Sequence, residues 1–191
     1  DTTGGVLKAT GATYTITGAN TGTVTNLGGT FAGMSSLSDT TGGSLKASGA
    51  TYTITGANTG SVTNLSGTFA GMANLSDTGP TGTLVATGAT YTTTGVRTGS
   101  VTNLSGTFAG MANLSDTTGG VLKGTGNTYT ITGANTGSST NVTGTFAGMS
   151  SLSDTTGGVL KATGATYTIT GANTGSVTNL SGTDRKSTRL N

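Results

Sequence analysis

The sequence of 191 residues contains no cysteine, no histidine, no tryptophan and no glutamate. Without cysteine, the chain can form neither a disulfide framework nor a thiolate metal site. Without histidine and glutamate, it lacks the commonest general base and two frequent metal ligands. We therefore expect no catalytic residue, no cofactor-binding residue and no metal ligand, and we predict that the chain is not an enzyme.

Charged residues and long apolar runs are also scarce. Charged residues make up 7% of the chain and hydrophobic residues 31%, and no apolar run is long enough for a membrane-spanning helix. By contrast, 36 glycines, 49 threonines and 19 serines fill more than half of the chain. Low apolar content with high net charge indicates disorder, but the formal net charge here is only +2. The composition argues against a mixed α/β domain and favours a regular fold with a narrow core.

A repeated segment makes up nearly all of the chain. The phrase Asp-Thr-Thr-Gly-Gly-x-Leu-Lys begins at Asp1, Asp39, Asp116 and Asp154, and a variant begins at Asp77. The period is 38 residues, and the third repeat is one residue longer because of its Gly-Pro turn. We therefore predict a single array of five repeats, at residues 1–38, 39–76, 77–115, 116–153 and a truncated 154–183.

Strict alternation marks the strands of each repeat. Residues 13–17 read Thr-Tyr-Thr-Ile-Thr, so a strand places Tyr and Ile on one face and threonines on the other. Each repeat consists of two similar passes of roughly 18 to 20 residues, which is the size of one solenoid coil. Helices are disfavoured because Gly and Thr recur every few residues. The pattern predicts an all-β parallel β-solenoid in which each 38-residue repeat forms two coils.

Aromatic residues supply the expected core. Stacked coils place equivalent residues about 4.8 Å apart, so the inward aromatic side chains are predicted to form one ladder. Its members are Tyr14, Phe31, Tyr52, Phe69, Tyr91, Phe108, Tyr129, Phe146 and Tyr167.

The array has one carboxylate per repeat, at its first residue. Carboxylates two coils apart lie about 9 to 10 Å from each other, near the upper separation used by inverting glycosidases, so a polysaccharide-degrading β-helix enzyme is one alternative. An active site breaks repeat symmetry, however, whereas this Asp recurs at the same turn. We therefore expect an Asx turn in which the Asp carboxylate accepts hydrogen bonds from the following Thr and Gly amides. One carboxylate per repeat also falls short of the oxygen ligands that a calcium site requires.

The other polar rows are assigned to the surface and the turns. Lys8, Lys46, Lys123 and Lys161 are expected to point outward, and four spaced lysines do not predict a nucleic-acid partner. Asn residues at repeated turn positions are expected to bond from coil to coil. Threonine rows also resemble the face of ice-binding β-helices, but they occur only in every second coil, which leaves gaps in the lattice.

Residues 184–191 depart from the repeat. After Thr183 the repeat requires Phe-Ala-Gly-Met, but the chain reads Asp-Arg-Lys-Ser-Thr-Arg-Leu-Asn. This octapeptide matches the in-frame translation of a common sequencing-adapter oligonucleotide, so we interpret it as a non-native read-through tail. A genuine basic tail that binds an anionic partner is the alternative. Without these residues the array carries no net charge.

Two phrases of the chain carry a resemblance to a known family. Residues 10–22 read Thr-Gly-Ala-Thr-Tyr-Thr-Ile-Thr-Gly-Ala-Asn-Thr-Gly, and residues 67–76 read Gly-Thr-Phe-Ala-Gly-Met-Ala-Asn-Leu-Ser. Together with the composition and period of residues 1–183, these resemble the repeats of filamentous-haemagglutinin-like and related β-strand-repeat bacterial surface adhesins. The resemblance implies a right-handed parallel β-helix, exported through an outer-membrane transporter to the bacterial cell surface or the extracellular space.

The same resemblance implies the function. The chain is expected to be a shaft segment that acts as a spacer, as a multivalent adhesive surface, or as both. Its expected partner is a host glycan, matrix or cell-surface ligand. A functional-amyloid or other extracellular-matrix subunit is the alternative, because Gly- and Asn-rich repeats with regular aromatics can also stack between chains.

Overall fold

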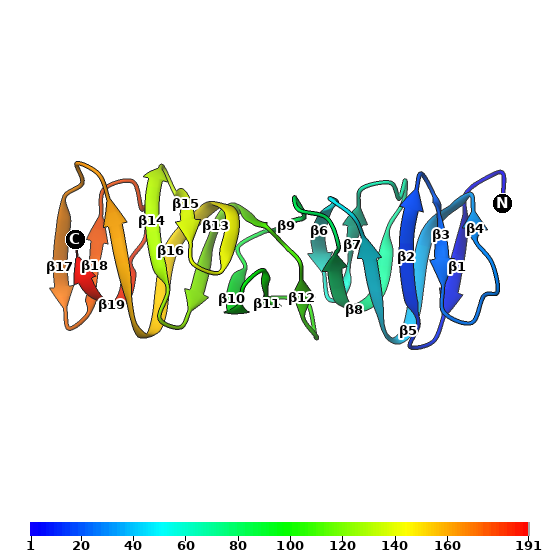
Figure 1. The fold of residues 1–191 in the computed structure, drawn as a ribbon, viewed down its shortest axis with the longest axis horizontal. Helices are drawn as coiled ribbons and strands as arrows, with labels where there is room; N and C mark the ends of the chain where they lie inside the picture. Colours follow the sequence, from blue (N-terminus) through cyan, green and yellow to red (C-terminus); the bar gives the residue numbers. More distant parts are fainter. Residues whose placement is uncertain (191) are drawn as a thin grey trace. The chain divides into compact units, whose positions relative to one another are not determined.

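The computed structural model describes the backbone of residues 1–190 and the side chains of residues 1–184. Within residues 1–190 the chain forms nineteen strands and no helix, which confirms the predicted all-β class (Figure 1). The chain divides into two compact units, unit 1 (residues 1–85 and 103–111) and unit 2 (residues 86–102 and 112–191). The division into five sequence repeats stays a prediction.

Each unit is built from short strands of two to nine residues and from longer ones. Unit 1 contains β1 (Gly5–Ala9), β2 (Thr13–Gly18), β3 (Thr21–Val24), β4 (Phe31–Ala32), β5 (Met34–Ala47), β6 (Thr51–Gly56), β7 (Thr59–Val62), β8 (Phe69–Asp77), most of β9 (Thr83–Ala86) and β12 (Phe108–Ala109). Unit 2 contains β10 (Thr90–Gly95), β11 (Thr98–Val101), β13 (Asn113–Gly124), β14 (Thr128–Gly133), β15 (Thr136–Ser139), β16 (Val142–Ala162), β17 (Tyr167–Gly171), β18 (Thr174–Val177) and β19 (Asp184–Leu190).

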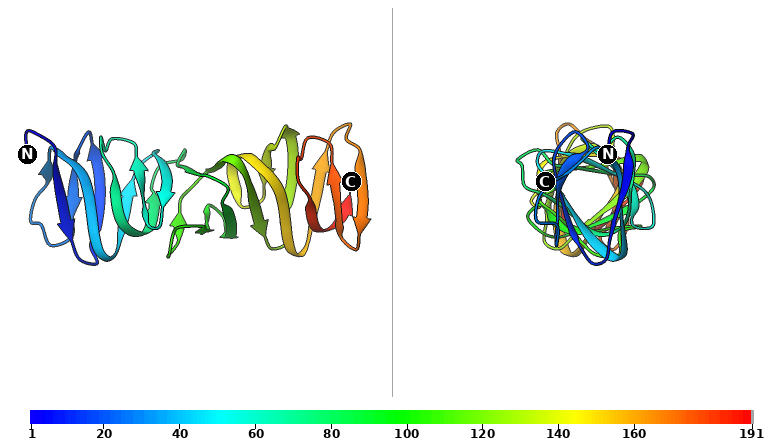
Figure 2. Two further views of the ribbon diagram at one scale, coloured as in Figure 1. Left: turned by 180° about the vertical axis from the view of Figure 1, so that it is seen from behind. Right: turned by 90° about the vertical axis from the view of Figure 1, so that its right-hand side faces the viewer.

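Parallel pairing between strands far apart in the sequence forms the coils of unit 1. β1 pairs with β5 and places Leu7 beside Leu37, and β5 pairs with β8 and places Leu37 beside Phe69. β2 also pairs with β5, which places Tyr14 beside Leu45. In the end-on view of Figure 2, the blue and cyan strands of this unit follow one another around a ring. These stacked parallel coils confirm the predicted β-solenoid.

A hairpin inside each repeat corrects the prediction of two coils per repeat. β2 and β3 are antiparallel, with Tyr14 opposite Val24, and β3 and β4 are antiparallel, with Gly22 opposite Phe31. The chain reverses at Asn20, whose φ is 52°, and Asn tolerates this left-handed conformation. The second pass of the repeat therefore folds back onto the first. The prediction was wrong because the Gly-Ala-Asn-Thr-Gly segment closes a hairpin instead of joining two coils.

Unit 2 has the same arrangement. β10 pairs in parallel with β13, placing Tyr91 beside Leu122, and β14 pairs in parallel with β16, placing Tyr129 beside Leu160. β14 and β15 form the antiparallel hairpin. The β10–β11 hairpin carries Arg97 at the reversal, with a φ of 59°, where the other repeats have Asn.

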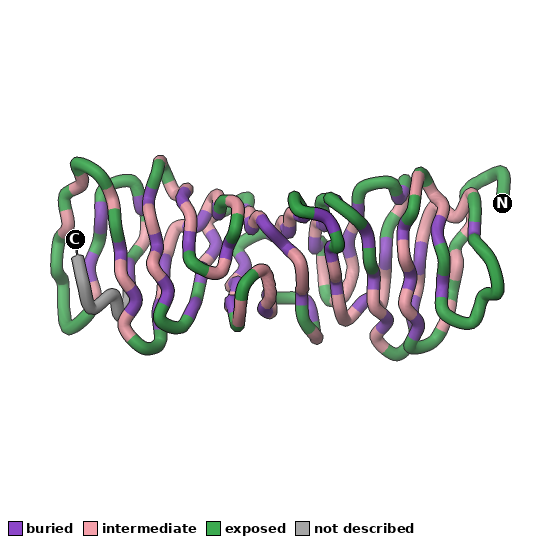
Figure 3. The backbone as a smooth tube through the Cα atoms, viewed as in Figure 1, coloured by how far each residue is buried: buried purple, intermediate pink, exposed green. Residues whose placement is uncertain are grey.

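Alternation along the strands places the core on the inward face of each unit, and buried and half-buried residues alternate along many strands in Figure 3. Of the predicted aromatic residues, Tyr14, Tyr52, Tyr91, Tyr129, Phe31, Phe69, Phe108 and Phe146 are all buried. They do not form one ladder, because the parallel register places a leucine beside Tyr14 and another beside Phe69. Parallel partners lie about 31 residues apart instead of one whole repeat, so the aromatic residues lie beside leucines, and leucines such as Leu45 and Leu75 also lie beside each other.

Glycines in the second strand of the hairpins allow the phenylalanine rings to pack closely. A Cβ at Gly60 would overlap the carbonyl oxygen of Thr53 and would lie 2.7 Å from Cζ of Phe69. Gly22 and Gly137 are placed in the same way. Glycine is therefore required here for lack of space, and not for an unusual φ.

The backbone of residues 184–190 continues the solenoid. β19 pairs in parallel with β16 and places Asp184 beside Leu152. Asp184 is buried, and it takes the register position that Phe146 holds in the preceding repeat. Residue 191 and the side chains that follow Asp184 lie outside the described residues. The interpretation of residues 184–191 as a non-native tail stays a prediction.

We expect Gly60→Ala to lower the free energy of unfolding by about 1–3 kcal/mol, because the added methyl group must displace a carbonyl or a ring. Urea unfolding followed by circular dichroism measures the change. Gly28→Ala is the matched control, since no atom lies within 4 Å of a Cβ at that position. Equal unfolding midpoints for the two variants would contradict the close packing of Phe69 on Gly60.

Candidate functional site

The Asp that opens a repeat is buried and joins two repeats. Asp39 is 6% exposed. Its Oδ1 accepts the backbone N–H of Gly11 at 2.9 Å, and its Oδ2 accepts that of Ala12 at 2.8 Å. Oδ1 also accepts the N–H of Thr41 at 3.0 Å, which is the predicted Asx-turn bond. The sequence reasoning missed the two bonds to the preceding repeat.

The same bonds recur in both units. Asp1 differs because it is exposed and its Oδ1 accepts the N–H and the O–H of Thr3. In the buried sites, each carboxylate accepts two consecutive N–H groups of the preceding repeat: Asp77 from Gly49 and Ala50, Asp116 from Gly88 and Ala89, and Asp154 from Gly126 and Asn127.

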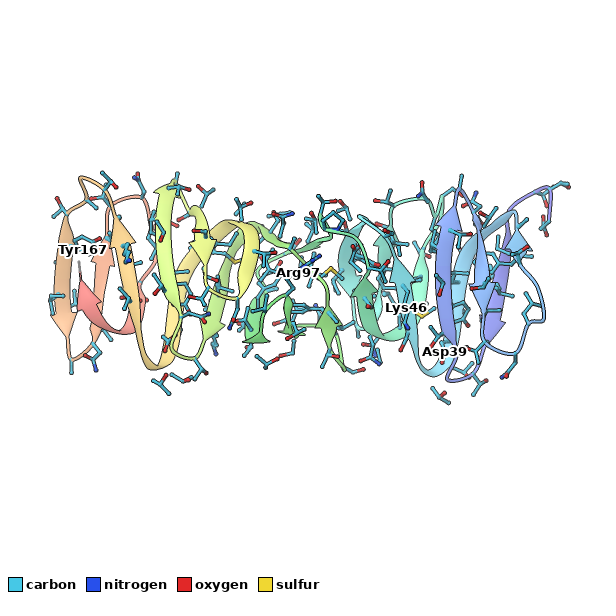
Figure 4. The ribbon with its side chains drawn as sticks, viewed as in Figure 1. Asp39, Lys46, Arg97 and Tyr167 are labelled. Carbon is cyan, nitrogen blue, oxygen red and sulfur yellow. The ribbon has the colours of Figure 1, made fainter. Side chains whose placement is uncertain are left out.

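A tyrosine of the preceding repeat completes each buried site. The hydroxyl of Tyr14 donates to the carbonyl oxygen of Ser38 at 2.6 Å, and Ser38 directly precedes Asp39, which is labelled in Figure 4. We call the Asp, its two backbone donors, the Tyr and the Ser carbonyl an Asp–Tyr clamp. The equivalent tyrosine bonds join Tyr52 to Ser76, Tyr91 to Ser115 and Tyr129 to Ser153.

Burial and hydrogen bonding set the protonation states of the clamp. Burial raises the pKa of Tyr14, and the negative charge of Asp39 raises it further. Burial also raises the pKa of Asp39, but the N–H donors of Ala12, Thr41 and the neighbouring glycines together outweigh burial and hold that pKa below its usual value. At neutral pH the phenol is therefore a neutral donor and the carboxylate an ionised acceptor.

The other clamps show the same effect on the phenol. Burial raises the pKa of Tyr52, Tyr91 and Tyr129, and the Asp of each clamp adds to the rise. A carboxylate with both oxygens bonded to backbone N–H groups, beside a phenol that keeps its proton, is arranged to hold coils together. Among the described residues, no group of three or more acidic, His or Cys side chains could hold a metal ion.

The repeated asparagines also bond from coil to coil. The N–H of Asn20 donates to the carbonyl oxygen of Asn64 at 2.7 Å, and its Oδ1 accepts the N–H of Ser66 at 2.8 Å. Asn58 and Asn135 make equivalent bonds to Ser105 and Ser181. In each of these bonds to serine the Oδ1 of the asparagine accepts a backbone N–H and not the amide of another asparagine.

The outward faces carry hydroxyl groups and lysines. Lys46 of β5, labelled in Figure 4, is exposed and lies between Thr15 and Ser76 in the parallel register. The threonine rows are therefore interrupted by other side chains. In unit 2 a groove of about 310 Å³ lies beside the equivalent lysine, and hydroxyl-bearing residues line it: Thr90, Ser151, Ser153 and Thr183.

Three buried polar side chains of unit 2 escaped the sequence reasoning. Thr93, Asn127 and Ser139 are buried where other repeats have Ile, Ala and Val. The hydroxyl of Ser139 has no hydrogen-bond partner among the described residues. A position-by-position comparison of the five repeats finds all three residues as departures from the common pattern.

Comparison with known proteins finds no relative of the chain. No protein-family model, curated protein or solved structure matches the chain. In the part of the chain that the structure describes, no helix is long and apolar enough to cross a membrane.

Asp39→Asn tests the clamp. The amide nitrogen replaces one acceptor by a donor that faces a backbone N–H, so we expect a loss of about 1–3 kcal/mol of stability at pH 7. The pKa of Asp39 is lowered by folding, so its contribution is complete at neutral pH and is lost as the pH falls below the unfolded value of about 3.9. Thermal unfolding between pH 7 and pH 2 should therefore show a smaller acid destabilisation in the variant.

The control for this experiment is Asp1→Asn, because Asp1 is exposed and bonds within its own turn. We expect the control to keep the melting temperature and the acid response of the natural chain. An Asp39→Asn variant that also kept both would contradict the role of the clamp.

Ser139→Val should raise the stability by about 1 kcal/mol, because it removes a buried hydroxyl without a partner and restores the residue of the other repeats. Urea unfolding measures the change. Ser138→Val on the same strand is the control, because residue 138 is partly exposed. A midpoint for Ser139→Val at or below that of the natural chain would show that the hydroxyl is bonded in solution.

Proposed function

We propose that the chain is a repetitive shaft segment of a large secreted or cell-surface bacterial adhesin, in which it acts as a spacer and as a multivalent adhesive surface. The Asp–Tyr clamp carries this proposal. At four successive junctions, the buried carboxylate accepts backbone N–H groups of the preceding repeat, and the tyrosine of that preceding repeat bonds to the carbonyl just before the carboxylate. Because the buried titratable groups make the same structural bonds at each junction, they favour a scaffolding role for the chain.

The proposal includes a right-handed parallel β-helix with a 38-residue repeat. The right hand is favoured because β-crossover-β connections in parallel sheets are almost always right-handed. The repeat length is supported by the recurrence of the clamp at Asp39, Asp77, Asp116 and Asp154. Export through an outer-membrane transporter to the cell surface rests on the resemblance of residues 1–183 to β-strand-repeat adhesins.

The adhesive role rests on the outward hydroxyl groups. Threonine and serine hydroxyls donate and accept hydrogen bonds, as sugar hydroxyls do. The groove beside Lys123 gathers several of them in one place. Each contact with a host glycan or matrix ligand is weak, so binding depends on repetition along the shaft and on the density of shafts.

Beads that carry the chain at increasing density test the adhesive role. We expect retention on glycan-coated surfaces and host cells to rise more steeply than the density, as multivalent binding does. Ser151→Ala/Ser153→Ala removes two hydroxyls of the groove and should lower retention, whereas the control Ser61→Ala/Ser66→Ala, outside the groove, should not. Absence of retention at every density would refute the adhesive role and leave the spacer role.

Location is tested separately. Antibodies against residues 1–183 should label intact cells of the bacterium that encodes the chain. Labelling that requires permeabilised cells would refute the surface location, whatever the beads show.

A further inference from the structure

Three departures from the repeat meet in the interior of unit 2. Thr93 of the third repeat stands where the other repeats have Ile, and Gly124 and Asn127 of the fourth stand where the others have Ala. The side-chain amide of Asn127 donates to Oγ1 of Thr93 at 3.2 Å. The hydroxyl of Thr93 in turn donates to the carbonyl oxygen of Lys123 at 3.1 Å. The amide of Asn141 donates to Oδ1 of Asn127 at 3.1 Å.

Gly124 provides the space for Asn127. A Cβ at Gly124 would overlap the amide nitrogen of Asn127 and would lie 2.7 Å from the hydroxyl of Tyr129. The larger side chain at position 127 is therefore matched by a smaller one at position 124. The departures in the third and fourth repeats are complementary in volume and in hydrogen bonding.

Near-identical repeats create a problem of register. The clamp donors are backbone N–H groups, which every repeat offers, and the paired strands have almost the same side chains. Stacking a repeat on the wrong neighbour leaves a loop, but the entropic cost of a loop grows only with the logarithm of its length. A slip by one whole repeat gives up the contacts of the repeat that is looped out, but the new junction keeps nearly all the contacts of a correct junction.

We propose that Thr93, Gly124, Asn127 and Asn141 form a register cluster that makes the fourth repeat stack on the third. On any other repeat, the buried amide of Asn127 would face an Ile in place of Thr93 and would lose a partner, which is costly in an interior. If the fifth repeat stacked on the third, Thr93 would face Ala165. A single buried polar residue fixes the pairing of coiled-coil helices in the same way.

Two pairs of introduced cysteines report the register, and they are the only thiols because the chain has no cysteine. In the structure Thr92 lies beside Lys123, and Thr130 lies beside Lys161. Thr92→Cys/Lys123→Cys therefore reports the correct stacking. Thr92→Cys/Lys161→Cys reports a slip that loops out the fourth repeat.

Each reporter is placed in the full chain and in the variant Thr93→Ile/Gly124→Ala/Asn127→Ala. The proteins are refolded from urea in a glutathione redox buffer, and disulfides are quantified by peptide mass spectrometry. We expect the slip disulfide to be scarce in the natural background and to rise about tenfold in the variant, as the loss of one discriminating buried bond predicts. The variant should still fold, because each replacement is the residue of the other repeats.

Ser139→Val is the matched control. It also replaces a buried polar residue by the residue of the other repeats, but Ser139 does not belong to the register cluster. It should leave the slip disulfide unchanged. The variant Gly124→Ala/Asn127→Ala, which keeps Thr93, should also raise the yield of the slip disulfide. An unchanged slip disulfide in both cluster variants, with the circular dichroism of the natural chain, would overturn the proposal, and so would an equal rise in the control.

Discussion

The hydrogen bonds that a buried Asp accepts from backbone N–H groups of the preceding repeat are the interaction on which this solenoid depends. Only 31% of the chain is hydrophobic, and polar contacts between coils add to the packing of the buried side chains. Asp39 adds directional, charge-assisted bonds to Gly11 and Ala12. Tyr14, which follows these donors, donates its hydroxyl to the carbonyl oxygen of Ser38, next to Asp39. Together these bonds attach β2 and the residues before it to β5, which holds Leu45 beside Tyr14 in the core.

Local features of the fold were predictable because they depend on neighbours in the sequence. The alternation over residues 13–17 correctly placed Tyr14 and Ile16 inward, and the Asx turn at Asp39 follows from Asp and the next two residues. The pairing of strands was not predictable in the same way. The two-residue loop between Gly18 and Thr21 is a hairpin signal, but the similarity of the two passes favoured successive coils, and so the register was misplaced.

The candidate site shows the same division between local and distant contacts. The partners of Asp39 and Tyr14 lie in another repeat, and the repeat pattern does not state which strands meet. The buried polar residues of unit 2 were missed for a different reason. An Ala-to-Asn change reads as a tolerated surface variation until the register shows that Asn127 and Thr93 face each other in the interior.

Because the clamp donors are backbone N–H groups, arrays of this kind can grow by duplication of whole repeats. An N–H group is present whatever side chain the residue carries, so the donor half of each clamp survives most substitutions, as it does at Asn127, where Ala is usual. Duplication of a whole repeat therefore creates a junction that already has its acceptor, its donors and its tyrosine. Repeat number can change in one genetic step without a compensating mutation, and only departures such as the register cluster give a repeat a fixed place in the order.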